Sequence, residues 1–390
     1  MRYRGHLPAL DGLRGLAVLS VLWFHCLWSQ DALAEPTRLD TVYQRLRGAG
    51  WMGVDLFFVL SGFLITGILL DADKRNYFRR FYRRRTLRIF PLYYAFLLGV
   101  VLLAWLYPSP NSTRLMGVQP WLWSYATNVL VALQGTLAIQ SVNHLWSLAV
   151  EEQFYLVWPL VVRWTTAKRV AQVCLLLIAV ALVARLAVDT RPVTRYMLTP
   201  FRMDALAMGG LLAALLRMEW SLRAWPFLAT GAVILAWVGL KLRVLSWIPE
   251  LMQGFGYTGS ALLAAGLLLL ALRRGWFEWR WLRFLGKYSY GIYLLHFPLI
   301  DWFTDVVQAW GPPPRLLRSQ IPAEIAFTLF ALSLSTGAAL LSWVLIEQPF
   351  LKLKERRARA HAVAAGAPLN LRVDSRPPPW ASEPPSQPLS

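Results

Sequence analysis

The sequence is poor in cysteine, in acidic residues and in charged residues generally. Of its 390 residues only two are cysteine, and both lie in apolar stretches, so a disulfide framework is not expected. Charged residues make up 16% of the chain, whereas soluble domains carry about 25%. Acidic residues are the scarcer kind, with 21 Asp and Glu against 40 Lys and Arg. These shortages exclude an ordinary soluble domain or a disulfide-stabilised secreted one.

Hydrophobic residues account for 57% of the chain and fall in repeated runs separated by short basic or proline-rich segments. Runs of about 18–24 apolar residues are long enough to cross a bilayer as helices. The sequence therefore predicts an all-α, polytopic transmembrane bundle of about ten spans. The expected spans are residues 9–28, 54–71, 89–107, 146–163, 171–188, 203–218, 225–243, 256–273, 286–305 and 321–346.

Two further segments are expected outside these spans. The stretch Trp121–Leu133 is apolar but short, which is typical of a re-entrant or interfacial helix. Residues 351–390 are first basic and then rich in proline and serine, and we expect them to form a disordered cytoplasmic tail. Residues 1–350 are then one transmembrane domain.

The placement of lysine and arginine predicts the orientation of the chain. Basic residues concentrate in residues 74–88, 273–287 and 352–359, which fall on the side of the N-terminus if there are ten spans. About 25 basic residues lie on that side and about 12 on the other, which favours cytoplasmic N- and C-termini in a cell (inner) membrane. The formal net charge of +19 then reflects topology, and membrane lipids rather than nucleic acid are the expected surroundings.

The stretch Leu7–Cys26, which contains most of the first expected span, carries ionisable residues where an apolar helix should have none. Asp11, Arg14 and His25 interrupt it, although such a residue costs at least about 2.5–3.5 kcal/mol inside a membrane and usually has a function. Arg14 and His25 lie within roughly 20° of each other around the helix and about 16 Å apart along it. Asp11 stands three residues before Arg14, where a local ion pair can form.

Helix geometry places other polar residues near the depth of His25. In the orientation above, His25 lies about 24 Å along the first span. Glu151 and Glu152 lie roughly 9–10 Å below the outer face, Ser61 about 12 Å below it, and Asp55 at its mouth. The two glutamates point about 100° apart, so we expect only one to reach His25. Ser61 belongs to an SGF triplet that would equally allow close helix packing.

The similar depths of these side chains predict one polar site in the outer part of the membrane. Other residues near the outer ends or middles of spans are candidates for contact with a substrate. They are Trp146, Arg202, Asp204 and His296. No metal site is expected among them.

The cytoplasmic segment FRRFYRRRTLRIFPLYY, residues 78–94, is suited to phosphate groups. Arginine binds phosphate in a bidentate manner, and tyrosine adds stacking surface. The candidates are Arg84, Arg85, Arg88 and Tyr93. The positive-inside rule alone would also place arginines here, so both interpretations remain open.

Six segments in order resemble the acyltransferase-3 family of integral membrane O-acyltransferases. They are LDGLRGLAVLSVLWFH (10–25), GVDLFFVLSGFLIT (53–66), RRRTLRIFPLYY (83–94), WSLAVEEQFYLVWP (146–159), GKYSYGIYLLHFPL (286–299) and IEQP (346–349). The resemblance implies acyl transfer from acyl-CoA, with acetyl-CoA the expected donor, to a hydroxyl of a lipid-linked or surface glycan such as lipopolysaccharide. It also implies that Arg14 and His25 are needed for activity. Many relatives carry a C-terminal extracytoplasmic esterase-like domain, which we do not expect here.

Histidine has an unperturbed pKa of about 6.5 and can take a proton from a sugar hydroxyl, so we expect His25 to be the general base. Glu151 or Glu152 would orient its imidazole, and Arg14 would position the donor. Ser61 would hydrogen-bond the acceptor or an intermediate, and a covalent acyl–Ser61 route stays open. Acyl-CoA is a substrate in this scheme, so no permanently bound cofactor is expected.

A membrane transporter or flippase of an anionic or glycan substrate is the alternative function. Polar residues at two depths could line an alternating-access path. The sequence shows neither an internal repeat nor paired broken helices, which weakens this interpretation. The acceptor, the acyl chain length and the oligomeric state are left open by the sequence.

Overall fold

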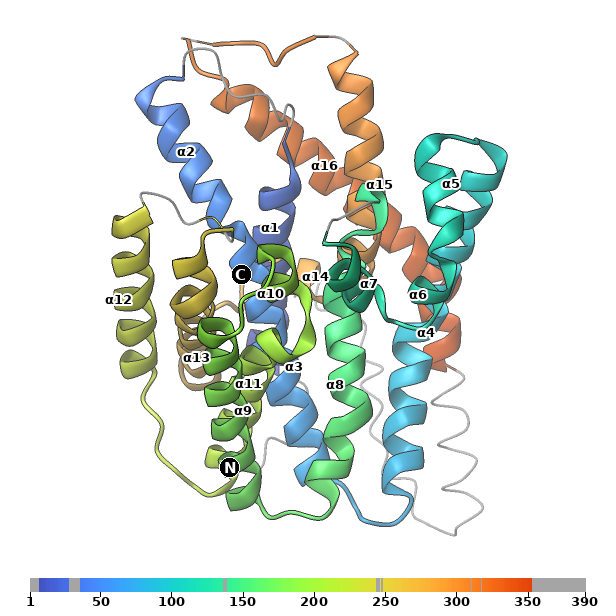
Figure 1. Ribbon diagram of the computed structural model, residues 1–390. Coiled ribbons are helices and arrows are strands. Elements are labelled where there is room, and N and C mark those ends of the chain that lie inside the picture. Colours follow the sequence, from blue (N-terminus) through green and yellow to red (C-terminus); the bar gives the residue numbers. More distant parts are fainter. Residues whose placement is uncertain are drawn as a thin grey trace, which may run out of the picture.

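The structure is a computed structural model that describes residues 7–27, 36–135, 139–242, 246, 248–309, 311–316 and 318–352. These residues form a bundle of helices packed side by side (Figure 1). The predicted tail lies outside the described residues beyond Lys352. The prediction of an all-α architecture is confirmed for the described ranges, where no strand longer than an isolated bridge occurs.

Every predicted span coincides with a helix of 18 residues or more. These helices are α1 (Pro8–His25), α3 (Met52–Leu70), α4 (Tyr77–Leu106), α8 (Leu145–Arg163), α9 (Ala167–Ala187), α11 (Thr199–Arg217), α12 (Ala224–Leu242), α13 (Tyr257–Arg274), α15 (Ser289–Gln308) and α16 (Ile321–Ser342). Within the described ranges, seven helical stretches are both long and apolar enough to cross a membrane. Helices α1, α8 and α15 are not among them, although they are long enough.

Short helices fill the connections between the long ones. They are α2 (Arg38–Gly48), α5 (Pro110–Gly117), α6 (Gln119–Trp123), α7 (Thr127–Gln134), α10 (Pro192–Met197) and α14 (Arg280–Lys287), with single turns η1 (Ala49–Trp51), η2 (Gln140–Val142), η3 (Met252–Gly256) and η4 (Trp343–Glu347). The single short helix predicted over residues 121–133 is therefore two helices, α6 and α7, which meet at Tyr125 in a left-handed backbone conformation with φ of 54°.

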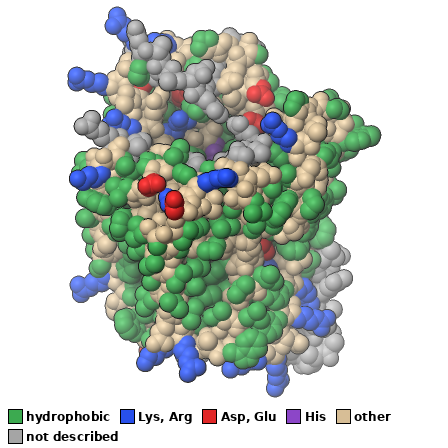
Figure 2. Space-filling model, in the orientation of Figure 1, with side chains coloured by type: hydrophobic (Ala, Val, Ile, Leu, Met, Phe, Trp, Pro, Cys, Tyr) green, Lys and Arg blue, Asp and Glu red, His purple; other side chains and the backbone are tan. Residues whose placement is uncertain are grey.

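The surface has the pattern of a protein that crosses a bilayer. Hydrophobic side chains cover much of the lower half of the face shown in Figure 2, whereas lysine and arginine lie along its lower edge and over its upper half. The turns that follow α3, α8 and α11 lie together at the lower end of the bundle, whereas α2 and α5 lie at its upper end (Figure 1).

Helix α3 is the central element of the bundle and packs against α1, α8, α11 and α13. Its approach to α11 requires glycine on both helices. A Cβ atom at Gly62 would lie 1.9 Å from the Leu206 carbonyl oxygen, and one at Gly209 would lie 2.0 Å from that of Val59. Small residues at a helix interface allow such close packing inside a membrane. The packing role predicted for the SGF triplet is confirmed for Gly62, and this packing fixes the position of Ser61 beside it.

Candidate functional site

Two cavities lie within the bundle, and Val54 and Tyr293 line both of them. The first, which we call the inner cavity, has a volume of about 110 Å³ and is lined by residues of the arginine-rich part of α4. The second, the outer cavity, has a volume of about 640 Å³ and is lined by His25 at the C-terminal end of α1. Arg14 and His25 of α1 therefore line different cavities, Arg14 the inner one and His25 the outer one.

The inner cavity brings together three of the predicted arginines, Arg14, Arg85 and Arg88. Arg14 pairs with Asp11 at 3.6 Å, as their spacing predicts. The guanidinium of Arg85 lies 4.1 Å from the centre of the Tyr155 ring. Three guanidinium groups around one cavity suit a ligand with phosphate groups, because each can bind two phosphate oxygens.

A serine and a glutamate face these arginines. The hydroxyl of Ser61 donates a hydrogen bond of 2.7 Å to Oε1 of Glu151, and both residues line the inner cavity. Among the described lining residues Glu152 is absent. We expected one of the two glutamates to reach His25, but among the described residues neither lines the outer cavity, and Glu151 instead lines the inner cavity with Arg14.

Two predicted donor contacts lie elsewhere. Arg84 is exposed and does not belong to the described lining of either cavity. Tyr93 is buried, its hydroxyl donates to the Leu122 carbonyl at 2.8 Å, and its ring stacks on Tyr125 at 4.0 Å. Its surroundings are those of a packed core residue.

Three histidines meet at the outer cavity. Nδ1 of His25 lies 3.1 Å from Nε2 of His296, and the ring of His144 lies 5.3 Å from that of His296. In Figure 2 a histidine is visible at the bottom of a hollow in the upper half of the face. The described histidines are these three, so the hollow reaches this cluster from outside the bundle.

Hydrogen bonds determine which ring nitrogen carries the proton. Nδ1 of His296 lies 2.5 Å from the Tyr293 carbonyl oxygen, and a carbonyl can only accept, so this nitrogen is protonated. In the neutral ring Nε2 of His296 is then an acceptor, and Nδ1 of His25 must donate to it. Nε2 of His25 is left with a free lone pair. This is the tautomer that a general base requires.

The single polar site predicted from depth is divided between the two cavities. His25 lines the outer cavity, whereas Ser61 and Glu151 line the inner one. Depth along a helix does not give the direction in which a side chain points or the tilt of the helix. His296 thus occupies the place beside His25 that we expected a glutamate to take.

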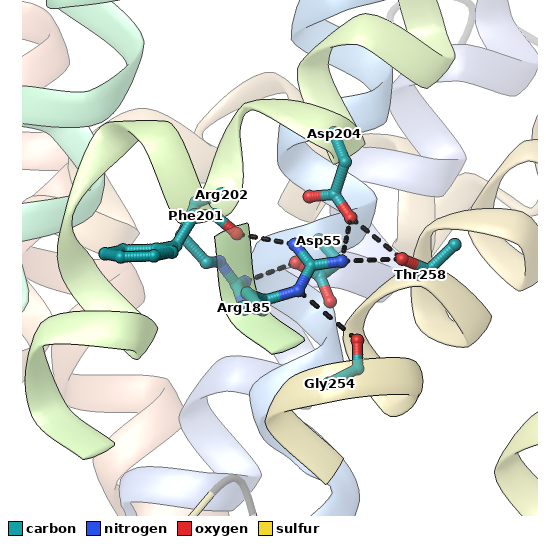
Figure 3. A network of polar contacts seen from close by, with 7 residues as sticks. All are labelled: Asp55, Arg185, Phe201, Arg202, Asp204, Gly254 and Thr258. Carbon is teal, nitrogen blue, oxygen red and sulfur yellow. Dashed lines mark hydrogen bonds and ion pairs between the residues drawn. The ribbon is translucent and has the colours of Figure 1, made fainter. Parts of the chain in front are cut away.

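Asp55, Arg202 and Asp204 form a buried charge network and do not line either cavity among the described residues (Figure 3). Arg202 of α11 forms an ion pair with Asp55 of α3, and both side chains are 1% exposed. Asp204 accepts a hydrogen bond of 2.8 Å from Nη2 of Arg185, which also donates to the Thr258 hydroxyl at 2.6 Å. This network ties four helices together.

The network nevertheless borders the outer cavity. The Arg202 guanidinium lies 5.1 Å from the centre of the Tyr196 ring and 5.8 Å from that of Trp146. Both rings line the outer cavity, so Trp146, a predicted substrate contact, lies in a cavity wall. Arg202 lies behind this wall, where it can position the rings but not contact their ligand.

Sequence reasoning missed His144 and Tyr293. His144 directly precedes α8, lines the outer cavity and is 2% exposed. The hydroxyl of Tyr293 donates to the His144 carbonyl at 3.2 Å. His144 lies just before an apolar run rather than inside one, so it lacked the signal of a costly membrane charge. Tyr293 is one of 14 tyrosines, and its sequence position alone does not distinguish it.

Comparison with known proteins gives a consistent result along nearly the whole described chain. The model of a family described as an acyltransferase domain matches residues 7–347. The peptidoglycan O-acetyltransferase OatA of Listeria monocytogenes is 29% identical over 367 residues, which cover 85% of this chain and 55% of that protein. No solved structure matches the chain.

Two further relatives show the same extent of similarity. The putative peptidoglycan O-acetyltransferase YrhL of Bacillus subtilis is 29% identical over 349 residues, covering 80% of this chain and 51% of that protein. The O-acetyltransferase OatA of Staphylococcus aureus is 29% identical over 367 residues, covering 83% and 56%. The chain therefore spans about half the length of the curated relatives it matches.

Proposed function

Because the chain belongs to the acyltransferase domain family that matches residues 7–347, we propose that it is a membrane O-acyltransferase acting on carbohydrate. Its donor is cytoplasmic acyl-CoA, most simply acetyl-CoA, and its acceptor is a hydroxyl of a surface or lipid-linked glycan. The relatives are described as peptidoglycan O-acetyltransferases, which supports a carbohydrate acceptor and an acetyl group. The apolar helices and the family make it a multi-pass membrane protein, for which we propose the inner membrane.

The observation that carries this proposal is the pair of cavities with different chemistry that share a wall at Val54 and Tyr293. Arginines surround the inner cavity, and histidines and aromatic rings surround the outer one. A donor with phosphates at one end and a thioester at the other matches this order. Its phosphates would contact Arg85 and Arg88 on the cytoplasmic side, and its thioester would extend past Tyr293 toward His25.

The reaction at the outer cavity follows from the tautomer of His25. Nε2 takes the proton of the acceptor hydroxyl while its oxygen attacks the thioester carbonyl carbon, so a C–O bond forms and the C–S bond breaks. The departing CoA thiolate receives the proton from the imidazolium, which restores the neutral ring. His296 accepts the hydrogen bond from Nδ1 of His25 and fixes the orientation of the ring throughout.

Replacement of His25 tests the assignment of the base. Radiolabelled acetyl-CoA is given to the purified protein in liposomes that contain envelope glycan, and labelled glycan is measured. General-base catalysis contributes about 10²–10⁴-fold, so His25→Ala should lower transfer by at least about 100-fold. Retention of near-full transfer would show that His25 is not the base.

Ser20→Ala is the matched control on the same helix. The Ser20 hydroxyl donates to the Leu16 carbonyl of its own helix at 3.0 Å, and among the described residues Ser20 belongs to the lining of neither cavity. This variant should transfer acetyl groups within about twofold of the wild-type rate. Uptake of label into vesicles without labelled glycan would instead favour a transporter.

A further inference from the structure

His144 carries a buried hydrogen-bond acceptor that has no partner among the described residues. Its Nε2 lies 3.0 Å from the Leu294 carbonyl oxygen, which can only accept, so the proton of the neutral ring is on Nε2. Nδ1 is consequently an unprotonated acceptor. It is buried and receives no hydrogen bond from any described residue. Leaving such a group unsatisfied costs about 1–3 kcal/mol, so a ligand that donates to it would recover this energy.

His144, the residue that carries this acceptor, belongs to the wall of the outer cavity. His144 and His25 both line that cavity. Both rings contact His296: the distance between ring centres is 5.1 Å for His25 and 5.3 Å for His144. Both also contact Phe297, at 4.7 Å for His25 and 5.3 Å for His144. Two free lone pairs therefore occur on neighbouring imidazoles of one cavity.

The rest of the cavity suits the ring of a sugar. Its volume of about 640 Å³ falls within the range of about 300–1,000 Å³ of small-molecule sites. Aromatic rings, which pack against the C–H faces of sugars, form much of its wall, and no described lining residue is Lys, Arg, Asp or Glu. Those rings are Phe24, Trp51, Trp146, Tyr196, Tyr293 and Phe297.

We propose that His144 binds the acceptor sugar, with its Nδ1 accepting a hydrogen bond from a second hydroxyl beside the one that reacts at His25. This inference rests on the proposed function, since it requires a carbohydrate acceptor in the outer cavity. His144 acts as a specificity residue: it selects acceptors that carry a hydroxyl next to the reacting position. It takes no part in the transfer of the proton.

A purely structural role is the competing explanation, because Nε2 of His144 also ties the start of α8 to α15 through Leu294. Two substitutions separate the two nitrogens. In His144→Asn the side-chain amide reaches the position of Nδ1 and keeps an acceptor there, but it loses the contact with Leu294. In His144→Gln the longer amide reaches the position of Nε2 and keeps that contact, but it leaves no acceptor toward the cavity.

The experiment uses the full chain in liposomes with radiolabelled acetyl-CoA and graded concentrations of glycan extracted from envelopes of the strain that encodes the protein. His144→Gln should raise the half-saturating glycan concentration about tenfold. His144→Asn should change it by less than threefold. Thermal unfolding followed by tryptophan fluorescence should be unchanged in His144→Gln, because this variant keeps the contact with Leu294.

Only a selective effect of His144→Gln supports the proposal. The proposal would be overturned by equal effects of both variants, by an effect of His144→Asn alone, or by no effect of either. An effect of His144→Asn alone would establish the hydrogen bond to Leu294 as the role of His144. Failure of the wild-type protein to label any glycan would remove the proposed function and this inference with it. Normal wild-type transfer with an unchanged His144→Gln variant would remove the inference alone.

Discussion

Glu151 and Glu152 are neighbours in the sequence but have different surroundings. Glu151 accepts the hydrogen bond of Ser61 and lines the inner cavity with Arg14. Glu152 is part of the same helix turn, and the described lining of that cavity does not include it. A rotation of about 100° between successive residues is enough to separate them. The pair therefore offers a matched comparison of a residue in the site with one beside it.

Glu151→Gln should lower acetyl transfer about tenfold, and Glu152→Gln should lower it less than threefold. The Gln amide can still accept from Ser61, but a hydrogen bond to a neutral group is weaker than one to a charged group by about 1 kcal/mol or more. Transfer of label from acetyl-CoA to envelope glycan measures both. A larger effect of Glu152→Gln than of Glu151→Gln would contradict the placement of Glu151 at the site.

At the scale of single residues, the sequence could identify candidates but not their partners. Arg14 and His25 were recognisable because charges in an apolar helix are costly, and their common face follows from helical periodicity. The partner of His25 was not recognisable, because His296 is 271 residues away. Which helices lie side by side depends on tertiary packing, which spacing within one helix does not encode.

The contact between α3 and α11 shows how helices position the site. Gly62 and Gly209 bring the two backbones together, and the Asp55–Arg202 ion pair links the same two helices nearer their N-terminal ends. Removal of one partner of a buried ion pair costs about 3–5 kcal/mol, because the other charge is left uncompensated. Replacement of both partners by apolar residues is often neutral.

Asp55→Leu should therefore destabilise the protein strongly, and the double variant Asp55→Leu with Arg202→Met should regain most of the loss. Thermal unfolding in detergent, followed through the fluorescence of the 20 tryptophans, measures the effect. Asp71→Asn is the control: it removes the partner of Arg217 in an ion pair whose carboxylate is 37% exposed, and such pairs are worth about 0–1 kcal/mol. A wild-type melting temperature for Asp55→Leu would show that the pair does not stabilise the fold.

Elements were more predictable than their contacts. Hydrophobic run length located all ten long helices, since it reflects the thickness of a bilayer and needs no tertiary information. The short helices between them were harder to predict, as α6 and α7 illustrate, because their break depends on a left-handed residue, Tyr125. Such a conformation in a non-glycine residue has no sequence signal.

At the scale of the whole molecule, each of the three long helices that fall short in hydropathy carries a residue of the site. Helices α1, α8 and α15 supply Arg14, Glu151 and His296. Each polar residue lowers the mean hydropathy of its helix, and each lies against other helices, where it avoids lipid. Ten crossings would place the arginine-rich start of α4 on the cytoplasmic side, in agreement with the positive-inside rule.

Cysteine labelling tests whether α8 and α15 cross the membrane. Cys26 and Cys174 are buried and are replaced by Ala, and single cysteines are introduced at exposed positions on either side of each helix. In right-side-out vesicles a membrane-impermeant maleimide should label Asn111→Cys and Arg315→Cys. Thr166→Cys and Glu278→Cys should react only after permeabilisation, because the former follows α8 and the latter precedes α15.

The outcome discriminates between ten crossings and fewer. If Asn111→Cys and Thr166→Cys reacted on the same side, α8 would not cross, and Glu151 would not be held between the two faces of the membrane. If Glu278→Cys and Arg315→Cys reacted on the same side, α15 would not cross, and His296 would not be held between the two faces of the membrane. Since the proposed reaction moves an acyl group from cytoplasmic CoA to an outer acceptor, it requires the arginines of the inner cavity and the histidines of the outer cavity to lie toward opposite faces. Labelling of the two pairs on opposite sides is therefore the topology that this transfer needs.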